Sequence, residues 1–328
     1  MKTVKKFVFA SIFALIAAFL SLRLGASALS GKVILEAILA GPTDTAGFIF
    51  WYVRLPRTAG CLLSGAALAV SGAVIQTVLH NHLASPSIIG VNAGAGLAVT
   101  VCCALGALSG WAVAGAAFLG AMVTVLLIVL VARKAGASRT TVILGGVAVN
   151  ATLNAFSESI TTLIPEVGVL TADFRSGGFG SVSHLRLVPA GVGICLALIF
   201  LFALHNELDI LALGDETAHA LGLRVSRIRT VLLVLAAMLC GCAVSFAGLL
   251  GFVGLLVPHA ARALVGSESK VLLPMCAVGG AGFVTACDLC ARLVFAPYEV
   301  PVGILLSMLG GPFFLMLLFR QKGGRQYA

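Results

Sequence analysis

Charge is what this sequence has least of. Only 10% of its 328 residues are Asp, Glu, Lys or Arg, against about 25% in ordinary soluble domains. A soluble surface needs more charge than this, so the composition excludes a soluble enzyme, a disordered chain and a free-standing nucleic-acid binder. Apolar residues make up 60% of the chain, and the mean hydropathy is +1.12. These values indicate a membrane protein with many spans.

The sequence also lacks the motifs of catalysis and metal binding. The only Gly-Lys pair, Gly31-Lys32, is followed by Val33, so no Walker A motif is present. All nine cysteines fall within apolar segments, where Cys behaves as a small apolar residue. The six histidines show no ligand spacing, and no nucleophile–His–acid set is visible. We therefore expect no catalytic site, no metal site and no cofactor bound by this chain.

Ten apolar runs of 16 to 25 residues approach or exceed the length of about 18 residues that a membrane span needs. The fold class we predict is an all-α polytopic membrane protein, organised as a single transmembrane domain over residues 1–328. The first run follows Lys2, Lys5 and Lys6 and also fits a signal peptide, but we favour an uncleaved span because its removal would leave an odd number of spans. The runs are 7–22, 58–79, 88–108, 111–132, 141–163, 187–204, 229–247, 249–265, 271–295 and 302–319.

The distribution of charge predicts the orientation of these spans. With the N-terminus inside, 14 of the 21 Lys and Arg residues lie on inside segments, together with only 5 of the 12 acids. Basic residues favour the cytoplasmic side. Both termini and the 205–229 loop should therefore be cytoplasmic, and the net charge of +9 reflects membrane topology instead of nucleic-acid binding.

The 205–229 loop is the longest charged segment on the inside. Gly214 can bend the chain, Asp215 is a good N-cap, and Gly222 is a good helix terminator. The loop should form two short helices, which either cover the inner end of the bundle or dock a cytoplasmic partner. The face shared at i, i+3 spacing consists of Ala218 and Leu221.

Arginines at the predicted outer ends of spans depart from the positive-inside bias. Arg54 and Arg57 flank Pro56, which suits the first turn of a helix. They either anchor the span to lipid headgroups or dock acidic residues of a partner. Arg292 lies four residues after Asp288, so an intrahelical ion pair competes with docking as its explanation.

Polar residues recur along one side of the predicted fifth span. Asn150, Asn154 and Glu158 follow i, i+4, i+8 spacing, and Gln76 lies within the second span. Polar groups in a membrane span usually face the protein interior or a water-filled cavity. They either bond neighbouring helices or line a transport pathway, and the spacing alone leaves both explanations open.

Several motifs in register resemble those of the FecCD-type permeases, the membrane subunits of ABC importers for iron–siderophore, haem and vitamin B12. The resemblance covers about residues 50–320. One departure is His82, where the family commonly has Pro. The motifs are Arg54-Leu55-Pro56-Arg57, Gly72 with Gln76, Asn81-x-Leu83-Ala84-x-Pro86, Gly177-Gly178-Phe179-Gly180, Leu213-Gly214-Asp215-Glu216-Thr217-Ala218 with Leu221-Gly222, Gly251-Phe252-Val253-Gly254 with Pro258-His259, and Pro301-Val302-Gly303 with Gly310-Gly311-Pro312-Phe313-Phe314.

The resemblance implies a type II ABC importer permease in the cytoplasmic membrane, acting as a homodimer or with a paralogous permease. Two cytoplasmic ATPase subunits would use ATP and Mg, and an extracytoplasmic binding protein would deliver the metal chelate. An iron–siderophore is the first choice, with haem or cobalamin as alternatives. The resemblance also places the fifth span beside the pathway and so favours lining by its polar residues. The implied roles are coupling in the 205–225 loop by Asp209, Leu213, Gly214, Asp215, Ala218, Leu221 and Gly222, docking by Arg54, Arg57 and Arg292, pathway lining by Gln76, Asn150, Asn154 and Glu158, and an inner gate at Asn81, Leu83 and Thr140.

An ion-coupled secondary transporter or a channel is the alternative class. Such a protein should carry an ion site within the bundle. Glu158 and Asp288 are the only acids well inside the predicted spans, which is thin support for ion coupling.

Overall fold

The computed structural model describes residues 2–25, 29–134, 139–294, 296 and 298–323. Every regular element within those residues is a helix, which confirms the all-α prediction. Each of the ten apolar runs coincides with one helix, within a few residues at the ends. These helices are α1 (Lys2–Arg23), α4 (Leu55–Val78), α5 (Val91–Ala104), α6 (Gly110–Lys134), α7 (Arg139–Leu163), α9 (His184–Ala203), α12 (Val225–Ala247), α13 (Val253–Val265), α14 (Ser269–Leu293) and α15 (Val302–Gly323).

Not every one of these helices is long and apolar enough to cross a membrane. Among the described residues, six segments meet both criteria, and three shorter apolar helices do not reach the required length. The predicted count of ten spans is therefore not confirmed, although several spans are. The six segments are Thr3–Arg23, Thr45–Val78, Gly110–Val131, His184–Ala203, Val225–Ala247 and Ser269–Leu293.

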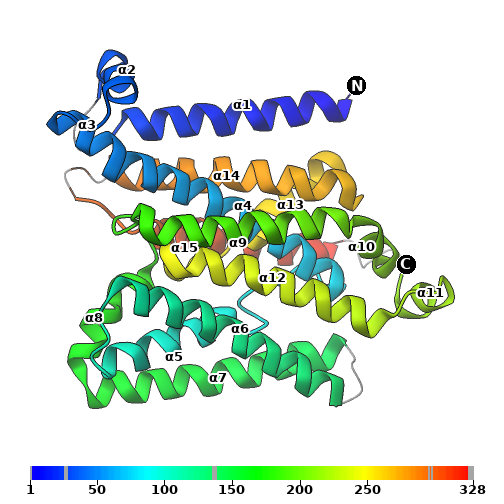
Figure 1. The fold of residues 1–328 in the computed structure, drawn as a ribbon. Coiled ribbons are helices and arrows are strands. Elements are labelled where there is room, and N and C mark those ends of the chain that lie inside the picture. Colours follow the sequence, from blue (N-terminus) through cyan, green and yellow to red (C-terminus); the bar gives the residue numbers. More distant parts are fainter. Residues whose placement is uncertain (1, 26–28, 135–138, 295, 297, 324–328) are drawn as a thin grey trace.

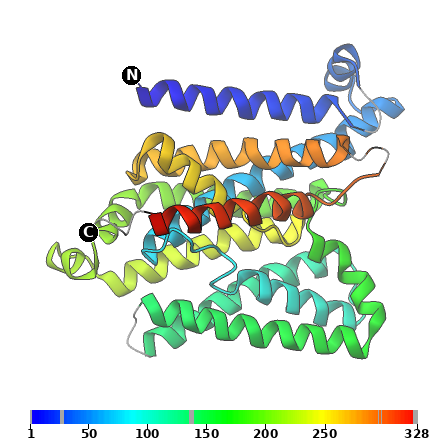
Figure 2. The same ribbon diagram turned by 180° about the vertical axis from the view of Figure 1, so that it is seen from behind.

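Helix α4 is the packing centre of the bundle. It packs against α12, α13 and α14, while α1 lies at one edge and α7 at the other (Figures 1 and 2). Small residues allow this close packing. A Cβ added to Gly65 would lie 2.2 Å from the carbonyl oxygen of Gly280 in α14. One added to Gly72 would lie 2.0 Å from that of Gly254 in α13.

Further helices lie outside the apolar runs. The helices α2 (Gly31–Ala40), α3 (Thr45–Ile49) and α8 (Pro165–Ser176) lie at one end of the bundle (Figure 1). A short π-helix, η1 (Phe50–Arg54), joins α3 directly to α4. We call this the arginine end, because Arg54, Arg57 and Arg292 lie there. The helices α10 (His205–Ala212) and α11 (Asp215–Ala220) mark the opposite, coupling end.

The two short helices predicted in the charged loop are present. Gly214 separates α10 from α11 with φ of 110°, and Gly222 follows α11 with φ of 83°. These positive φ angles favour glycine. The predicted N-cap at Asp215 is wrong, because Gly214 occupies that position. The Asp215 carboxylate instead lies 2.6 Å from Arg229 in α12.

Candidate functional site

The three arginines predicted to dock a partner are buried at the arginine end. Arg54, Arg57 and Arg292 are 5%, 8% and 4% exposed, and Asp288 beside them is 1% exposed. Groups this deep offer little free surface to a partner. Docking by these arginines therefore stays a prediction, and the observed contacts give them a structural role first.

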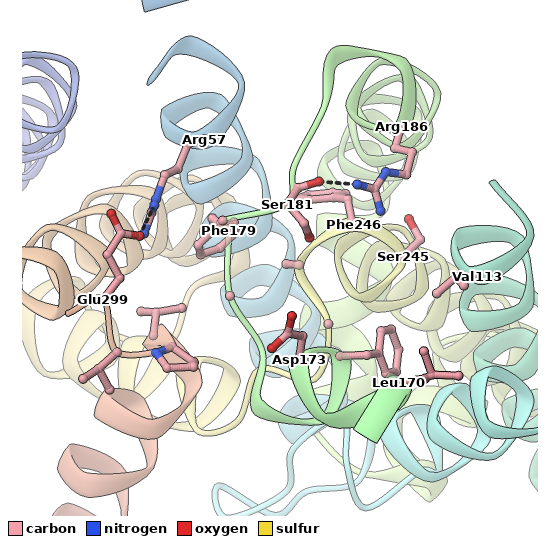
Figure 3. A pocket seen from close by; sticks show the side chains of 18 residues that line it. Arg57, Val113, Leu170, Asp173, Phe179, Ser181, Arg186, Ser245, Phe246 and Glu299 are labelled. Atoms are coloured by element: carbon pink, nitrogen blue, oxygen red, sulfur yellow. Dashed lines mark hydrogen bonds and ion pairs between the residues drawn. The ribbon is translucent and has the colours of Figure 1, made fainter. Parts of the chain in front are cut away.

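Arg57 bridges two carboxylates. Its Nε and Nη2 donate to Asp288 at 3.1 Å and 3.0 Å. Its Nη1 donates to Glu299 at 2.7 Å, as Figure 3 shows. The Asp288 side chain is 1% exposed and that of Glu299 is 45% exposed. Paired bonds between guanidinium and carboxylate are among the stronger polar contacts, so Arg57 fastens α4 to α14.

Arg292 makes the intrahelical ion pair that the spacing allowed. Its Nε lies 3.0 Å from Asp288 Oδ2, four residues earlier in α14. Its Nη2 donates to Ser21 at 2.8 Å, and both Arg292 and Arg54 donate to the carbonyl oxygen of Leu24. The same charged cluster thus also ties the end of α1 to α14 and α4.

A cavity of about 500 Å³ lies beside this cluster. Its walls come from α8, the segment after it, the end of α12 and the start of α15. Arg57 and Glu299 lie on one side, and Arg186 lies across from them (Figure 3). The apolar part of the lining includes Leu170, Phe174, Phe179, Phe246 and Pro301.

Motifs that are far apart in the sequence meet at this cavity. The backbone nitrogen of Gly178 donates to Ala247 at 2.8 Å, and that of Gly303 donates to Gly177 at 3.1 Å. A Cβ on Gly303 would lie 2.1 Å from the carbonyl oxygen of Ser176, so only glycine fits there. The glycine motifs therefore serve the close packing of three segments around the cavity.

The polar stripe on α7 divides in two. Asn150 is half-buried, and its Nδ2 donates to the carbonyl oxygen of Ser87 at 2.7 Å. Asn154 and Glu158 are exposed in the single chain. Asn150 therefore bonds a neighbouring segment, as the alternative explanation required, while pathway lining by Asn154 and Glu158 stays a prediction.

Gln76 is fully buried between helices. Its Nε2 donates to the carbonyl oxygen of Gly254 at 3.0 Å, and Arg262 donates to its Oε1. Both contacts are with α13. Gln76 therefore bonds two helices and does not face an open space within the described chain.

The predicted inner gate forms a tight turn after α4. Asn81 Oδ1 accepts a hydrogen bond from the backbone nitrogen of Leu83 at 2.9 Å, which is ordinary turn chemistry. Burial, with the positive charge of Arg262 next in importance, lowers the pKa of His82 in this turn. The side chain of Thr140 lies outside the described residues. The gate role of all three predicted residues stays a prediction.

Helix α10 is fastened to the bundle on several sides. Leu208 and Leu211 are buried, and His80 Nε2 lies 2.8 Å from the carbonyl oxygen of Leu211. The Asp209 carboxylate accepts a hydrogen bond from the backbone nitrogen of Ser269 at 3.0 Å. Together with the Asp215–Arg229 pair, these contacts connect the coupling end to α4, α12 and α14.

The apolar face expected on α11 requires a correction. Ala218 is fully buried against the rest of the chain, so it cannot contact a partner. Leu221 is 61% exposed, and Leu213 at the bend is 62% exposed. Leu213 and Leu221 are therefore the large apolar side chains that this loop offers to a partner.

Several partners in these contacts escaped the sequence analysis. Glu299, Arg229 and His80 had no spacing relation to the residues that they contact, which lie 242, 14 and 131 positions away. No sequence signal marked them. Within the described ranges, no group of three His, Cys, Asp or Glu side chains is placed to hold a metal.

The profile of the FecCD transport family matches residues 13–320. This chain belongs to the FecCD transport family. The match includes all but the two ends of the chain, so the family covers the arginine end, the cavity and the coupling end alike. The assignment also makes this FecCD protein a multi-pass membrane protein, in agreement with its apolar helices.

Curated FecCD relatives cover most of the chain. The iron(3+)-hydroxamate import system permease protein FhuB of Bacillus subtilis is 38% identical over 94% of this chain and 81% of its own length. The hemin transport system permease protein HmuU of Yersinia pestis is 34% identical over 93% and 92%. The cobalamin import system permease protein BtuC of Halobacterium salinarum is 38% identical over 85% and 75%.

A solved structure shares the fold of this FecCD protein. A metal-chelate type ABC transporter in an inward-facing conformation superposes with a TM-score of 0.86 at 28% identity, covering 96% of this chain and 99% of that chain. PsaBC from Streptococcus pneumoniae, in complex with Fab, reaches a TM-score of 0.58 at 17% identity, covering 86% and 94%. The second likeness shows the fold alone.

Proposed function

We propose that this chain is the membrane permease of an ABC importer that carries a metal chelate into the cell. Two copies, or one copy and a paralogous permease, would enclose the pathway between them. The exposed polar residues of α7 would line that pathway. An iron–siderophore is the first candidate substrate, since FhuB is named for iron–hydroxamate import, and haem and cobalamin follow from the other relatives.

Energy would come from two separate cytoplasmic ATPase subunits that use ATP and Mg. The observation that carries this proposal is the anchoring of α10 and α11. The coupling end is held by His80 in the turn after α4, by the backbone nitrogen of Ser269 in α14 and by the side chain of Arg229 in α12. A partner that moves the exposed Leu213 and Leu221 would therefore also move α4, α14 and α12, because the loop stays folded and attached to them.

At the arginine end, an extracytoplasmic binding protein would deliver the chelate. The buried network of Arg54, Arg57 and Arg292 would lie beneath this contact. We further propose that the chain itself binds no cofactor and has no enzymatic activity, since the chelate passes through chemically unchanged.

Co-purification followed by ATP hydrolysis tests this proposal. The chain should copurify with an ATPase and respond to an extracytoplasmic binding protein, with hydrolysis rising when the chelate-loaded binding protein is added. A panel of radiolabelled ferric hydroxamate, haem and cobalamin then identifies the substrate. Uptake driven by a proton or sodium gradient without ATP would favour an ion-coupled carrier instead.

A further inference from the structure

Glu299 occupies the exposed edge of the Arg57 guanidinium. Asp288 takes the inner edge through Nε and Nη2, and its side chain is 1% exposed. Glu299 takes Nη1 at 2.7 Å, and its side chain is 45% exposed. A guanidinium presents its donors in a fixed fork, so the two edges bind carboxylates independently. The edge that Glu299 holds is the more exposed of the two, so it is the edge at which a carboxylate from outside would bind.

We infer that Glu299 competes with an acidic side chain of the docking partner for the guanidinium of Arg57. Its carboxylate fills the outer edge of Arg57 in the free permease and is displaced when the partner's carboxylate arrives. The inference rests on the proposed function, in which a binding protein docks at the arginine end. It also reconciles docking with the low exposure of Arg57.

An exchange of this kind makes docking readily reversible. The displaced pair and the new pair are both charge-assisted hydrogen bonds to the same guanidinium nitrogen, so their free energies largely cancel. The buried Arg57–Asp288 pair is untouched throughout. A partner that must leave after delivering its substrate benefits from such a weak net gain.

The structure gives the displaced carboxylate a place to go. Glu299 lines the cavity of about 500 Å³, so its side chain has room to turn away from Arg57. Arg186 lies on the facing wall and donates to the carbonyl oxygen of Ser181 (Figure 3). The positive charge of Arg186 attracts a carboxylate that has lost its first partner, and Asp173, which also lines the cavity, opposes this attraction in part.

Removing Glu299 should tighten docking. The test measures the Kd of the purified permease–ATPase complex for the binding protein that supports wild-type transport. We expect Glu299→Ala to lower this Kd about 3- to 10-fold, because the partner no longer displaces an internal acid. Asp173→Ala is the matched control, since it removes one negative charge from the same cavity without touching Arg57 in the described contacts.

The control separates local competition from a general charge effect. A Kd that is unchanged or raised by Glu299→Ala, or lowered equally by Asp173→Ala, overturns the inference. Glu299→Gln covers the case of poor folding, because it keeps an acceptor and loses only the charge. It should tighten docking less than the alanine variant does, and an unchanged Kd in this variant also counts against the inference.

A chemical probe tests the same claim without any partner. Phenylglyoxal modifies accessible arginines, and mass spectrometry reports the rate at Arg57. That rate should rise severalfold in Glu299→Ala and stay at the wild-type value in Asp173→Ala. An unchanged rate at Arg57 contradicts the inference. Should the wild-type complex show no response to a binding protein, the proposed function fails, while this probe still decides the role of Glu299.

Discussion

The Asp209 carboxylate caps helix α14 at Ser269, 60 residues further along the chain. The residue in the N-cap position of α14, Glu268, makes no capping hydrogen bond with its own side chain. The first turn of α14 therefore depends on a carboxylate supplied by α10. One hydrogen-bonded contact thus joins the coupling end to the helix that carries Asp288 and Arg292 at the arginine end.

Removal of this cap should uncouple the permease from its ATPase. We expect Asp209→Ala to cost about 1 kcal/mol of stability, as loss of a helix cap does, and to reduce hydrolysis stimulated by the binding protein more than basal hydrolysis. Asp209→Asn keeps a capping oxygen, so it should retain most of the stability and most of the stimulated hydrolysis. Thermal unfolding in detergent and ATP hydrolysis measure the two effects. Equal unfolding temperatures and equal stimulated hydrolysis in the Ala and Asn variants would show that the cap contributes to neither.

Charge introduced at Leu221, one of the two exposed leucines of the coupling end, should block ATPase binding selectively. Leu221→Arg changes a side chain that is 61% exposed, so folding should survive while copurification of the ATPase falls sharply. Ala218→Arg should instead impair folding, because it forces a long side chain into a fully buried position. Size-exclusion profiles distinguish lost assembly from lost folding. Normal copurification of the ATPase with Leu221→Arg would exclude this surface as the docking site.

Loss of the Asp288 carboxylate, which Arg57 and Arg292 share, should strongly lower the stability of the protein. Asp288→Ala leaves Arg57 and Arg292 buried without their common partner, and breaking a buried ion pair costs about 3–5 kcal/mol. The variant should unfold at a markedly lower temperature in detergent. Asp173→Asn, an exposed acid at the same end, should leave the unfolding temperature unchanged. A stable Asp288→Ala protein would mean that the network contributes little.

A single methyl group should disturb the contact of α4 with α14. Gly65→Ala places a Cβ 2.2 Å from a backbone oxygen of Gly280, so the helices must separate. Overpacking of this kind costs about 1–3 kcal/mol. Gly115→Ala in α6 has no atom within 4 Å of the new Cβ and serves as the control. Similar unfolding temperatures for the two variants would contradict the close helix contact.

Local patterns in the sequence predicted the long helices and the two short coupling helices. Hydrophobic runs mark buried or lipid-facing helices directly, and Gly214 and Gly222 mark the ends of α11 through their positive φ. The Asp288–Arg292 pair was equally visible, because the two residues lie one helical turn apart.

Contacts between segments that are far apart in the sequence could not be predicted from these local patterns. Asp215 has the residue type of an N-cap, yet a tertiary ion pair with Arg229 claims its carboxylate. Ala218 and Leu221 share a helical spacing, but packing of the loop on the bundle buries only the first. Arg57 shows no local sign of Glu299, which lies 242 residues away. The burial of a side chain and the residue with which it pairs depend on the assembled fold, so the spacing of residues in one sequence does not predict them.

Uptake into proteoliposomes tests the importer function most directly. The permease and its ATPase are reconstituted with ATP and Mg on the ATPase side, and radiolabelled ferric hydroxamate, haem or cobalamin is added with the binding protein on the other side. We predict that at least one chelate accumulates, that accumulation requires both ATP and the binding protein, and that Asp209→Ala reduces it. Absence of ATP-dependent accumulation of any of these chelates by an intact, correctly oriented complex would contradict the account.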